Sequence, residues 1–577
     1  MYNAVETRGF VLPYAIGRRF LLKLNFAQAP LLAWLGLIVV LPNLLLIATS
    51  FLGISKGRMI FAPTLANYAR LWNSNGFWHL LASTLEFSLA ASLCGALLAY
   101  PMAYFVARMT LRHKNLLTVL VLMPLWISLL MRVFSWRLIL GQSGLLNSLL
   151  VTTGILNQPS PLFLYTPFTV ILTFAYISVP YIFISTLNAF EKIPTSLIEA
   201  SQDSGATGLQ TFSHIVWPLT RRSLAIGVSL AFLVTVGDYV TPAMVGGIDG
   251  TTLGVLISSQ FGMANNWPFG AAASVALILS VGIVLSVLLW LCPSRGVFSG
   301  DEAPAIPHPL TGEGGVHWPT FAGSIGYGLV IAFLYAPLVL MVIFSFGAST
   351  VQSFPITEFT MKWYADLADT SGLLMAAQRS LIVAVSVVFF SSTIGTAFAL
   401  ALHFRPVRGS HAMELLLALP LAMPAVVLGV VMVLGTELLD IPSGLVRTII
   451  GQSSFVMPVT LMLVLARLRR LDPTLVEASL DLGAGRISSF LHVVLPLIKG
   501  AVIGGALLGL TLSADDVMVT LFLAGPSQTL PIWVFNQMRF GFTPSVNAVF
   551  TVLGMLCLTA VIVASWIAAS GRAKKLA

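Results

Sequence analysis

Long apolar runs are the feature that most constrains how this chain of 577 residues can fold. One of them, residues 31–45, is apolar on every helical face, and similar runs recur to the end of the chain. About 20 apolar residues are needed to cross a bilayer as a helix, and lipid leaves backbone hydrogen bonds unsatisfied unless the segment forms them internally. Only 9% of the residues are charged, against about 25% in soluble domains. Since the runs lack the alternation of barrel strands, they predict an all-α polytopic membrane protein.

The apolar runs predict twelve membrane spans in two sets of six. The predicted spans lie near 28–52, 79–107, 116–139, 163–189, 219–239 and 268–291, and then near 322–346, 377–403, 412–436, 447–467, 498–520 and 545–569. Segment 293–320 between the sets is rich in Pro and Gly and lacks apolar periodicity, which is typical of a linker. We therefore expect an N-terminal transmembrane domain, 1–292, and a C-terminal transmembrane domain, 321–577.

Lys and Arg are distributed unevenly between the predicted loops. They gather after spans two, eight and ten and in the C-terminal tail, whereas the loops at 140–161 and 240–267 contain neither. Because positive residues concentrate in cytoplasmic loops, both termini and the linker are predicted to be cytoplasmic. The same rule explains the net charge of +9, so nucleic acid is not an expected partner. Lys56, Arg58 and Arg70 are exceptions, in an outer loop that is long for the rule.

One polar stretch occurs twice, as EASQDSGATGLQTFSHIVWP at 199–218 and as EASLDLGAGRISSFLHVVLP at 477–496. The second copy is numbered 278 residues higher (477 minus 199), and this offset continues from Asp238 to Asp516. Two halves of six spans in the same orientation imply a pseudo-twofold axis along the membrane normal. A path for a solute can then lie between the halves.

Each copy is predicted to form two short helices separated by a turn. Gly205 and Gly483 supply the turn, and Pro218 and Pro496 stand where the first turn of a new helix tolerates proline. A short amphipathic helix of this kind can lie on lipid. The first copy, however, carries acids and no Lys or Arg, which favours a protein partner with its own groove.

The repeated pattern is Glu-Ala-Ser, three residues, Gly, nine residues, Ile or Val, one residue, Trp or Leu, and Pro. It resembles the EAA loop of type I ABC importer permeases, which docks in a cleft of a cytosolic ATPase. Ser201 and Ser479 replace the second Ala of that loop, and Trp217 replaces its Leu. The resemblance implies ATPase coupling for eight residues: Glu199, Ala200, Gly205, Pro218, Glu477, Ala478, Gly483 and Pro496.

The resemblance covers most of both halves. The first half resembles the B-type permease of spermidine/putrescine importers at 123–147 and 265–275, and the second resembles the C-type partner at 359–367, 376–385 and 511–548. Those importers usually use two separate chains, so this chain is expected to be a fused pair of six-helix domains. The resemblance implies a bacterial inner membrane, an extracytoplasmic solute-binding protein and two copies of a cytosolic ATPase that hold ATP and Mg.

The chain is not expected to hydrolyse ATP or to bind a cofactor or metal itself. A Walker A loop requires Gly-Lys-Ser/Thr, and none of the eight lysines is followed by Ser or Thr. No His/Cys cluster has metal-ligand spacing. The alternative class is a secondary transporter with six-plus-six spans, whose best-known superfamily has a Gly-x3-Asp-Arg-x-Gly-Arg-Arg loop after span two. Residues 107–115 lack its Gly and Asp.

Four acidic residues fall inside predicted spans: Glu86, Asp238, Asp515 and Asp516. Ionisable groups inside a bilayer usually face a cavity or a partner. We expect these carboxylates to line the path and to accept the ammonium groups of a cation such as a polyamine. The structural alternative pairs them with Arg132 or Arg137 of span three. Relatives also import aminophosphonates, opines and ferric iron, so the solute class stays open between these.

Overall fold

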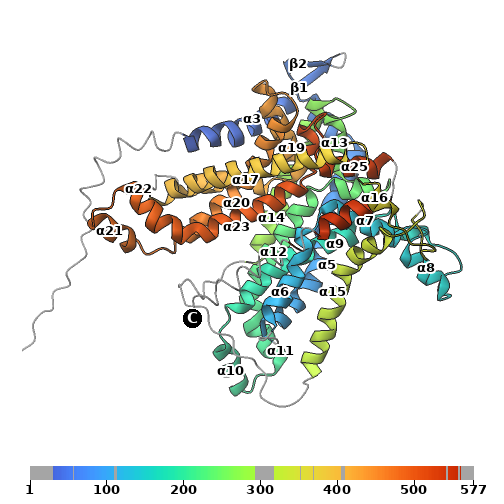
Figure 1. The fold of residues 1–577 in the computed structure, drawn as a ribbon, viewed down its shortest axis with the longest axis horizontal. Helices are drawn as coiled ribbons and strands as arrows, with labels where there is room; N and C mark the ends of the chain where they lie inside the picture. Colours follow the sequence, from blue (N-terminus) through green and yellow to red (C-terminus); the bar gives the residue numbers. More distant parts are fainter. Residues whose placement is uncertain are drawn as a thin grey trace, which may run out of the picture. The chain divides into compact units, whose positions relative to one another are not determined.

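The computed structural model describes residues 30–55, 58–108, 113–292, 318–350, 352–367, 369–404, 410–540, 544–555 and 559. This part of the chain is mainly helical, and its one sheet is the hairpin of β1 and β2 (Figure 1). The strands pair antiparallel with Gly53 opposite Ile60 and Ser55 opposite Arg58. The predicted all-α fold class is confirmed. The predicted linker lies almost entirely outside the described residues.

The bounds of the elements follow chain order. The first half contains η2 (Leu35–Val40), α3 (Leu41–Ser50), β1 (Leu52–Ser55), β2 (Arg58–Pro63), α4 (Ala66–Trp72), α5 (Asn75–Arg108), α6 (Lys114–Leu122), η3 (Met123–Trp126), α7 (Leu129–Leu140), α8 (Leu145–Thr152), η4 (Pro161–Phe163), α9 (Pro167–Glu191), α10 (Thr195–Asp203), α11 (Gly208–Thr211), η5 (Phe212–Val216), α12 (Trp217–Val236), η6 (Pro242–Gly246), α13 (Leu253–Phe261) and α14 (Trp267–Leu291). The second half contains α15 (Trp318–Phe344), α16 (Lys362–Ala365), α17 (Leu373–Phe404), α18 (Ser410–Ala422), α19 (Ala425–Leu438), α20 (Leu445–Leu468), α21 (Thr474–Asp481), α22 (Arg486–Ser489), η7 (Phe490–Val494), α23 (Leu495–Asp515), α24 (Thr520–Leu523), α25 (Leu530–Phe540) and a last helix, Ser545–Met555.

Nine helices among the described residues are long and apolar enough to cross a membrane. They account for most of the predicted spans, but two of the twelve predicted spans are not continuous helices. Span three is broken between η3 and α7, where the two parts are bent by 91°. Span nine is broken between α18 and α19. The predicted spans at 116–139 and 412–436 are thus each built from two helices with a break between them, and most of the predicted span at 545–569 lies outside the described residues.

Proline and extended backbone explain both breaks. Pro124 opens the tight turn of η3, and Ile127 then adopts extended angles of φ −96° and ψ 135°. In the second half Pro424 has φ −55° and ψ 133° directly before α19. A proline lacks the N–H that continues a helix. Met123 before Pro124 keeps helical angles, so the first break comes at Ile127, three residues after the proline. Each break leaves a new helix N-terminus inside an otherwise apolar segment.

The described chain forms two compact units that do not coincide with its two sequence halves. Unit 1 combines Met1–Leu44, Ala384–Leu421 and Gln452–Ser513, and unit 2 combines Leu45–Val383, Ala422–Gly451 and Ala514–Ala577. Unit 2 therefore contains parts of both halves, and contacts between the halves can be seen within it. The predicted domain limits at 292 and 321 stay predictions, because residues 293–317 are not described.

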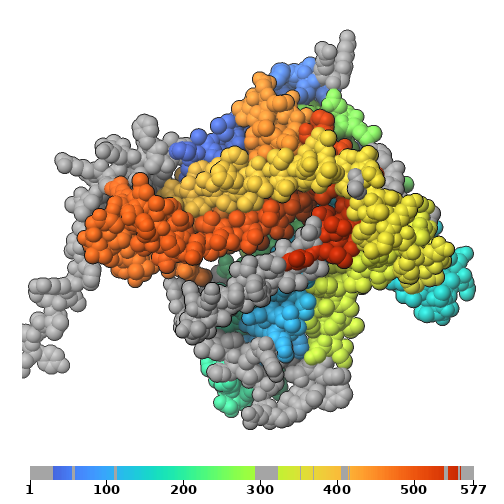
Figure 2. Space-filling model, viewed as in Figure 1, coloured from blue at the N-terminus to red at the C-terminus, as the bar shows by residue number. Residues whose placement is uncertain are grey.

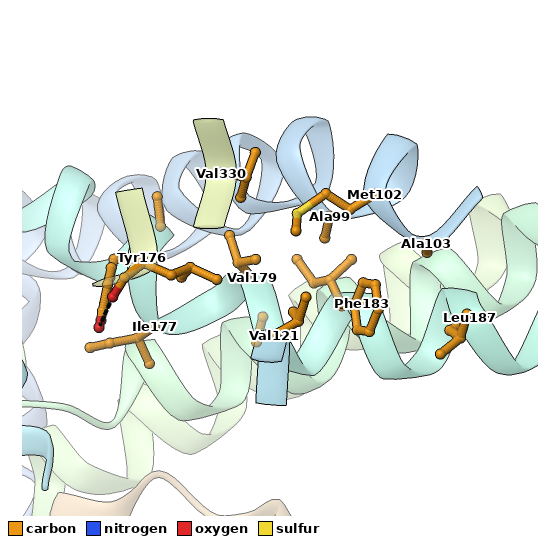
Figure 3. Close-up of a cluster of buried hydrophobic side chains, with 14 of the residues drawn as sticks. Ala99, Met102, Ala103, Val121, Tyr176, Ile177, Val179, Phe183, Leu187 and Val330 are labelled. Carbon is orange, nitrogen blue, oxygen red and sulfur yellow. Dashed lines mark hydrogen bonds between the residues drawn. The ribbon is translucent and has the colours of Figure 1, made fainter. Parts of the chain in front are cut away.

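The core of unit 2 is built around α5 and α9. Small residues allow a close approach, since a Cβ added at Gly95 would lie 2.8 Å from the Cβ of Ser178. Figure 3 shows Ala99 and Met102 of α5 beside Phe183 of α9, all three buried. Unit 1 has a separate apolar cluster formed by residues of α17, α20, α23 and the N-terminal helical segment.

Matching hydrogen bonds show that the two halves repeat one fold. The Thr84 hydroxyl accepts the N–H of Leu253 at 2.8 Å, and in the second half the Ser380 hydroxyl accepts the N–H of Leu530 at the same distance. The pair Ser50–Tyr68 at 2.7 Å is likewise repeated as Ser345–Tyr364 at 2.6 Å. The repeat seen in the polar stretches therefore extends to interactions between helices.

Candidate functional site

The two polar repeats adopt the same local structure. We call residues 195–218 the first EAA segment and residues 473–496 the second EAA segment. In the first, α10 ends two residues before Gly205, whose φ is +82°, and in the second, α21 ends two residues before Gly483, whose φ is +85° (Figure 1). Glycine adopts this left-handed conformation without steric cost, and it commonly ends a helix in this way. The predicted glycine turns are confirmed.

A side-chain hydrogen bond closes each turn. Ser201 bonds to Thr211 at 2.8 Å between hydroxyl oxygens, and Ser479 bonds to Ser489 at 2.6 Å. Ser201 and Ser479 are the two residues that replace the second Ala of the EAA pattern. The departure from the pattern thus adds a tie between the helix before the turn and the helix after it.

A π-helical turn then leads from each EAA segment into a long helix. These turns are η5 and η7. Each ends two residues before a proline, Pro218 after η5 and Pro496 after η7. A proline N–H is missing, so the carbonyl four residues earlier loses its partner and the helix locally widens. The helical path continues without a larger break from Gly208 to Val236 and from Arg486 to Asp515. The part of each EAA segment that follows the glycine turn is therefore the start of a helix about 45 Å long.

All eight predicted coupling residues are exposed on the EAA segments. These residues are Glu199, Ala200, Gly205, Pro218, Glu477, Ala478, Gly483 and Pro496. Two apolar side chains at matching positions are also exposed, Leu209 at 78% and Ile487 at 76%. The second segment, orange at the edge of Figure 2, presents this exposed surface directly. Ile198, Val216 and Val494 are buried and anchor the segments from beneath.

A buried arginine supports the first EAA segment. The Arg108 guanidinium donates from Nη2 to the carbonyl oxygens of Phe190 and Ile193, both at 2.7 Å. The Phe190 carbonyl lies in the last turn of α9, and the Ile193 carbonyl lies in the short link between α9 and α10. From the sequence alone, Arg108 indicates only the cytoplasmic side. Its acceptors are 82 and 85 residues away in the chain, so no local sequence pattern predicts these hydrogen bonds.

Asp238 and Asp516 occupy equivalent positions where α12 and α23 end. Asp238 is 2% exposed; it accepts N–H groups from Val240 at 2.7 Å and Thr241 at 3.0 Å, and it accepts the Thr241 hydroxyl. Asp516 accepts the N–H and the hydroxyl of Thr520 at 2.9 and 2.6 Å. The structure thus gives both carboxylates partners within their own half, where they satisfy backbone groups freed by the helix end.

Asp515 lies beside Asp516 but bonds to the other half of the chain. Its Oδ2 accepts the N–H of Leu129 at 2.8 Å, at the start of α7. A carboxylate there is favoured by the exposed N–H groups and the dipole of the helix. Its buried Oδ1 accepts no close hydrogen bond among the described residues, but the carboxylate also interacts with the Ser128 side chain and with Arg132. Asp515 therefore joins the end of α23 to the break in span three.

The equivalent contact, from the first half to the second, is made by a glycine. Gly237, 278 residues before Asp515, lies at the end of α12 and accepts the N–H of Val426 at 3.4 Å. A Cβ added at Gly237 would lie 2.4 Å from the backbone nitrogen of Ala425, the first residue of α19. The end of α12 thus meets the break before α19, and the end of α23 meets the break before α7. One contact uses a carboxylate and the other uses close backbone packing.

Of the remaining predicted charged residues, Arg132 interacts with the acids at these contacts, whereas Glu86 and Arg137 lie elsewhere. Glu86 is exposed on α5, and no hydrogen bond or ion pair involves it within the described ranges. Arg132 is buried, donates weakly to the Ser128 carbonyl at 3.4 Å, and interacts electrostatically with both Asp238 and Asp515. Arg137 instead lies over the ring of Tyr165, 5.9 Å from its centroid. Glu86 therefore stands apart from the other three predicted path acids, which are linked by electrostatic interactions through Arg132 and Tyr239.

A comparison with protein families shows which family the chain belongs to. The family described as "Binding-protein-dependent transport system inner membrane component" matches the chain twice, over residues 95–291 and 391–570. The chain belongs to this family. Each half of this permease contains one copy of the domain, and the multi-pass inner-membrane location predicted from the sequence is supported by the same match.

Curated relatives match the halves of the permease separately. The "Spermidine/putrescine transport system permease protein PotB" of Escherichia coli (strain K12) is 35% identical over 260 residues, which are 44% of this chain and 93% of the relative. The PotB of Salmonella typhimurium LT2 is 34% identical over 266 residues, 46% of this chain and 91% of the relative. The "Spermidine/putrescine transport system permease protein PotC" of E. coli K12 is 35% identical over 242 residues, 41% of this chain and 90% of the relative. The predicted resemblance to a fused B-type and C-type pair is confirmed.

Among solved structures, the permease is similar to a bacterial ABC transporter involved in the import of the acidic polysaccharide alginate. The likeness has a TM-score of 0.39 and 18% identity, and it covers 48% of this chain and 96% of that chain. The same transporter in complex with an alginate pentasaccharide-bound periplasmic protein gives a TM-score of 0.40, 17% identity, and coverage of 48% and 95%.

Proposed function

We propose that this chain supplies both transmembrane halves of an ATP-driven ABC importer and translocates a small charged organic solute, with a polyamine such as spermidine or putrescine as the preferred class. The observation that carries the proposal is the pair of EAA segments, which share glycine angles, closing hydrogen bonds and exposed residues. Two equivalent docking segments suit a motor made of two equivalent subunits. The names of the PotB and PotC relatives support the solute class.

In this proposal each EAA segment docks one copy of a cytosolic ATPase, and the two copies hold ATP and Mg. Leu209 and Ile487 supply exposed apolar side chains of the kind that fill pockets at protein interfaces. Glu199 and Glu477 supply exposed charges on the same segments. Because each segment continues into a long helix, movement at the docking end reaches Asp238 or Asp515 at the far end. Closure of the ATPase then favours one of two arrangements of the halves, which is alternating access.

The orientation of the proposed importer follows the distribution of Lys and Arg. Both termini, the linker at 293–320 and both EAA segments are cytoplasmic, and the loops at 140–161 and 240–267 face an extracytoplasmic solute-binding protein. The family description names binding-protein-dependent transport, which supports that partner. The ATPase and the binding protein are thus placed on opposite sides of the membrane.

Asp515 is the strongest candidate for contact with a cationic solute. Its Oδ2 is used at α7, and the carboxylate also interacts with the Ser128 side chain and with Arg132, so an ammonium group would bind at the buried Oδ1 in competition with these groups. Asp238 and Asp516 satisfy their own helix ends, so we propose that they shape the path more than they bind the solute. Glu86 is exposed on α5 and stays a candidate at a different depth.

Replacing Asp515 with asparagine is expected to lower uptake of spermidine by about tenfold, the effect of losing one charge-assisted hydrogen bond. The asparagine oxygen can still accept the Leu129 N–H, so the protein level should change less than about twofold. Uptake per milligram of membrane protein measures the difference. The matched variant is Asp516→Asn, whose amide would face donors at Thr520; it should lower protein level and uptake together. Equal losses in both variants would show that Asp515 is structural.

Reconstitution tests the function as a whole. The permease is purified with the ATPase and the binding protein encoded beside it and is placed in proteoliposomes. We expect accumulation of labelled spermidine or putrescine that requires ATP and both partners. Uptake driven by a proton or sodium gradient without ATP would instead support a secondary transporter. Uptake of an aminophosphonate, an opine or ferric iron but of no polyamine would retain the importer class and replace the solute.

A further inference from the structure

A cavity of about 610 Å³ lies at the end of α7, within unit 2. Its walls are the C-terminal part of α7, the turn at 141–144, residues 160–165 and Gln352 of the second half. The volume lies within the range of about 300–1,000 Å³ that is usual for binding pockets. None of the residues assigned above to coupling or to the solute path lines it.

The walls of this cavity are held in place by several hydrogen bonds. Asn147 is fully buried; its Nδ2 donates to the carbonyls of Gly141 and Ser160 at 3.0 and 3.1 Å, and its Oδ1 accepts the Ser160 N–H at 2.8 Å. The second half is attached at Phe354, which donates to the Ser143 carbonyl at 3.0 Å and accepts the Ser148 hydroxyl at 2.8 Å. The cavity is therefore preformed by both halves.

Arg137 is the charged residue of the cavity. Of the twelve residues that line it, Arg137 alone carries a formal charge, and none is acidic. Its guanidinium lies over the ring of Tyr165, and in the described part of the chain it has no ion pair. Tyr165 has φ +62°, a conformation that is costly for a tyrosine and that gathers at functional sites. An arginine fork held over an aromatic ring is suited to a carboxylate.

Gln352 adds unsatisfied polar groups to the same wall. Both its Nε2 and its Oε1 are buried and have no hydrogen-bond partner among the described residues. A buried amide without partners is costly, so an occupant or water is expected to satisfy it. The cavity thus presents one positive charge, one amide and an aromatic ring, and its lining offers no charge that would hold a cation.

We propose that this cavity receives an Asp or Glu side chain of the extracytoplasmic solute-binding protein, with Arg137 as its bidentate partner. The proposal rests on the proposed function, which places the loop at 140–161 on the side of the binding protein. Charge complementarity selects the occupant, since a polyamine would meet an unopposed guanidinium here. Because Gln352 comes from the second half, a docked carboxylate would contact both halves at once. The affinity for the binding protein would then depend on how the two halves are arranged.

The test is the affinity of the assembled importer for its binding protein. The permease and its ATPase are placed in lipid nanodiscs, and the dissociation constant is measured by biolayer interferometry. We expect Arg137→Gln to raise it by about tenfold, the effect of losing one desolvated charge-assisted pair. Arg137→Lys should give a smaller rise, because lysine keeps the charge without the fork. ATP hydrolysis in the absence of binding protein should not change.

The control variant is Arg70→Gln, which removes an exposed charge from another outer loop. It should change the dissociation constant by less than about threefold, as for other exposed charges. In the Arg137→Glu background, arginine substituted for one acidic residue of the binding protein should restore affinity and thereby identify the docked side chain. An unchanged affinity in Arg137→Gln, or an equal loss in Arg70→Gln, would overturn the proposal. A native complex that binds no such protein would contradict the proposed function itself.

Discussion

A permease carrying both Glu199→Ala and Glu477→Ala is expected to lose ATP-driven uptake by about a hundredfold while it keeps its fold. Both side chains are exposed and form no hydrogen bond or ion pair within the described ranges, so their removal should change the free energy of unfolding by no more than about 0.5 kcal/mol. At a docked interface, in contrast, a hydrogen-bonded charge contributes about 2–5 kcal/mol. The expected loss of uptake therefore comes from a weaker contact with the proposed ATPase and not from unfolding.

The measurement is solute uptake by proteoliposomes, together with ATP hydrolysis and co-purification of the ATPase. The matched control is Asp249→Ala with Asp369→Ala, which removes one exposed acid from each half, outside the EAA segments. This control removes the same total charge and should leave uptake within about twofold of the native value. Native levels of uptake in the double glutamate variant would contradict the assignment of the EAA segments to coupling.

The second large effect is expected for Gly237→Ala. The backbone of Gly237 has φ −87° and ψ −8°, which alanine adopts easily, so only space forbids the substitution. The new Cβ would lie 2.4 Å from Ala425 nitrogen and 2.8 Å from Pro424 Cα, and neither backbone atom can move away alone. We expect the end of α12 and the start of α19 to separate, at a cost of about 1–3 kcal/mol or more.

Thermal unfolding of the purified permease in detergent measures this cost. The control is Gly282→Ala in α14, where an added Cβ would meet nothing within 4 Å. Alanine in that helix should leave stability unchanged or raise it by up to about 1 kcal/mol. If both variants unfold at the same temperature, Gly237 is not the close contact that the geometry indicates.

The contacts of Gly237 and Asp515 explain why the two halves are similar without being interchangeable. Both residues stand at the same place in the repeat, and each meets the helix that follows the break in the other half. A carboxylate can hold a helix N-terminus by charge, whereas glycine permits the backbones to touch. Because the two contacts differ, only one of these two equivalent positions carries an acid.

Apolar composition predicted the membrane class but not the shape of the spans. The runs at 116–139 and 412–436 are apolar on both sides of their breaks, so hydropathy alone cannot divide them. Pro124 and Pro424 are the local signal that could have indicated the breaks. Whether a proline in a membrane helix bends it or ends it depends on which neighbouring groups satisfy the freed backbone, and those neighbours are distant in sequence.

The sequence by itself determined the membrane environment, the duplication and the EAA segments, because span length and a repeated spacing are properties of the chain read in order. Glycine turns at Gly205 and Gly483 followed from residue type alone. Only the tertiary structure decided the roles of the acids. Asp515 and Asp516 are neighbours in the chain, yet one satisfies its own helix end and the other bonds to Leu129, 386 residues away. Successive side chains on a helix diverge by about 100°, and what each then meets is set by packing between helices.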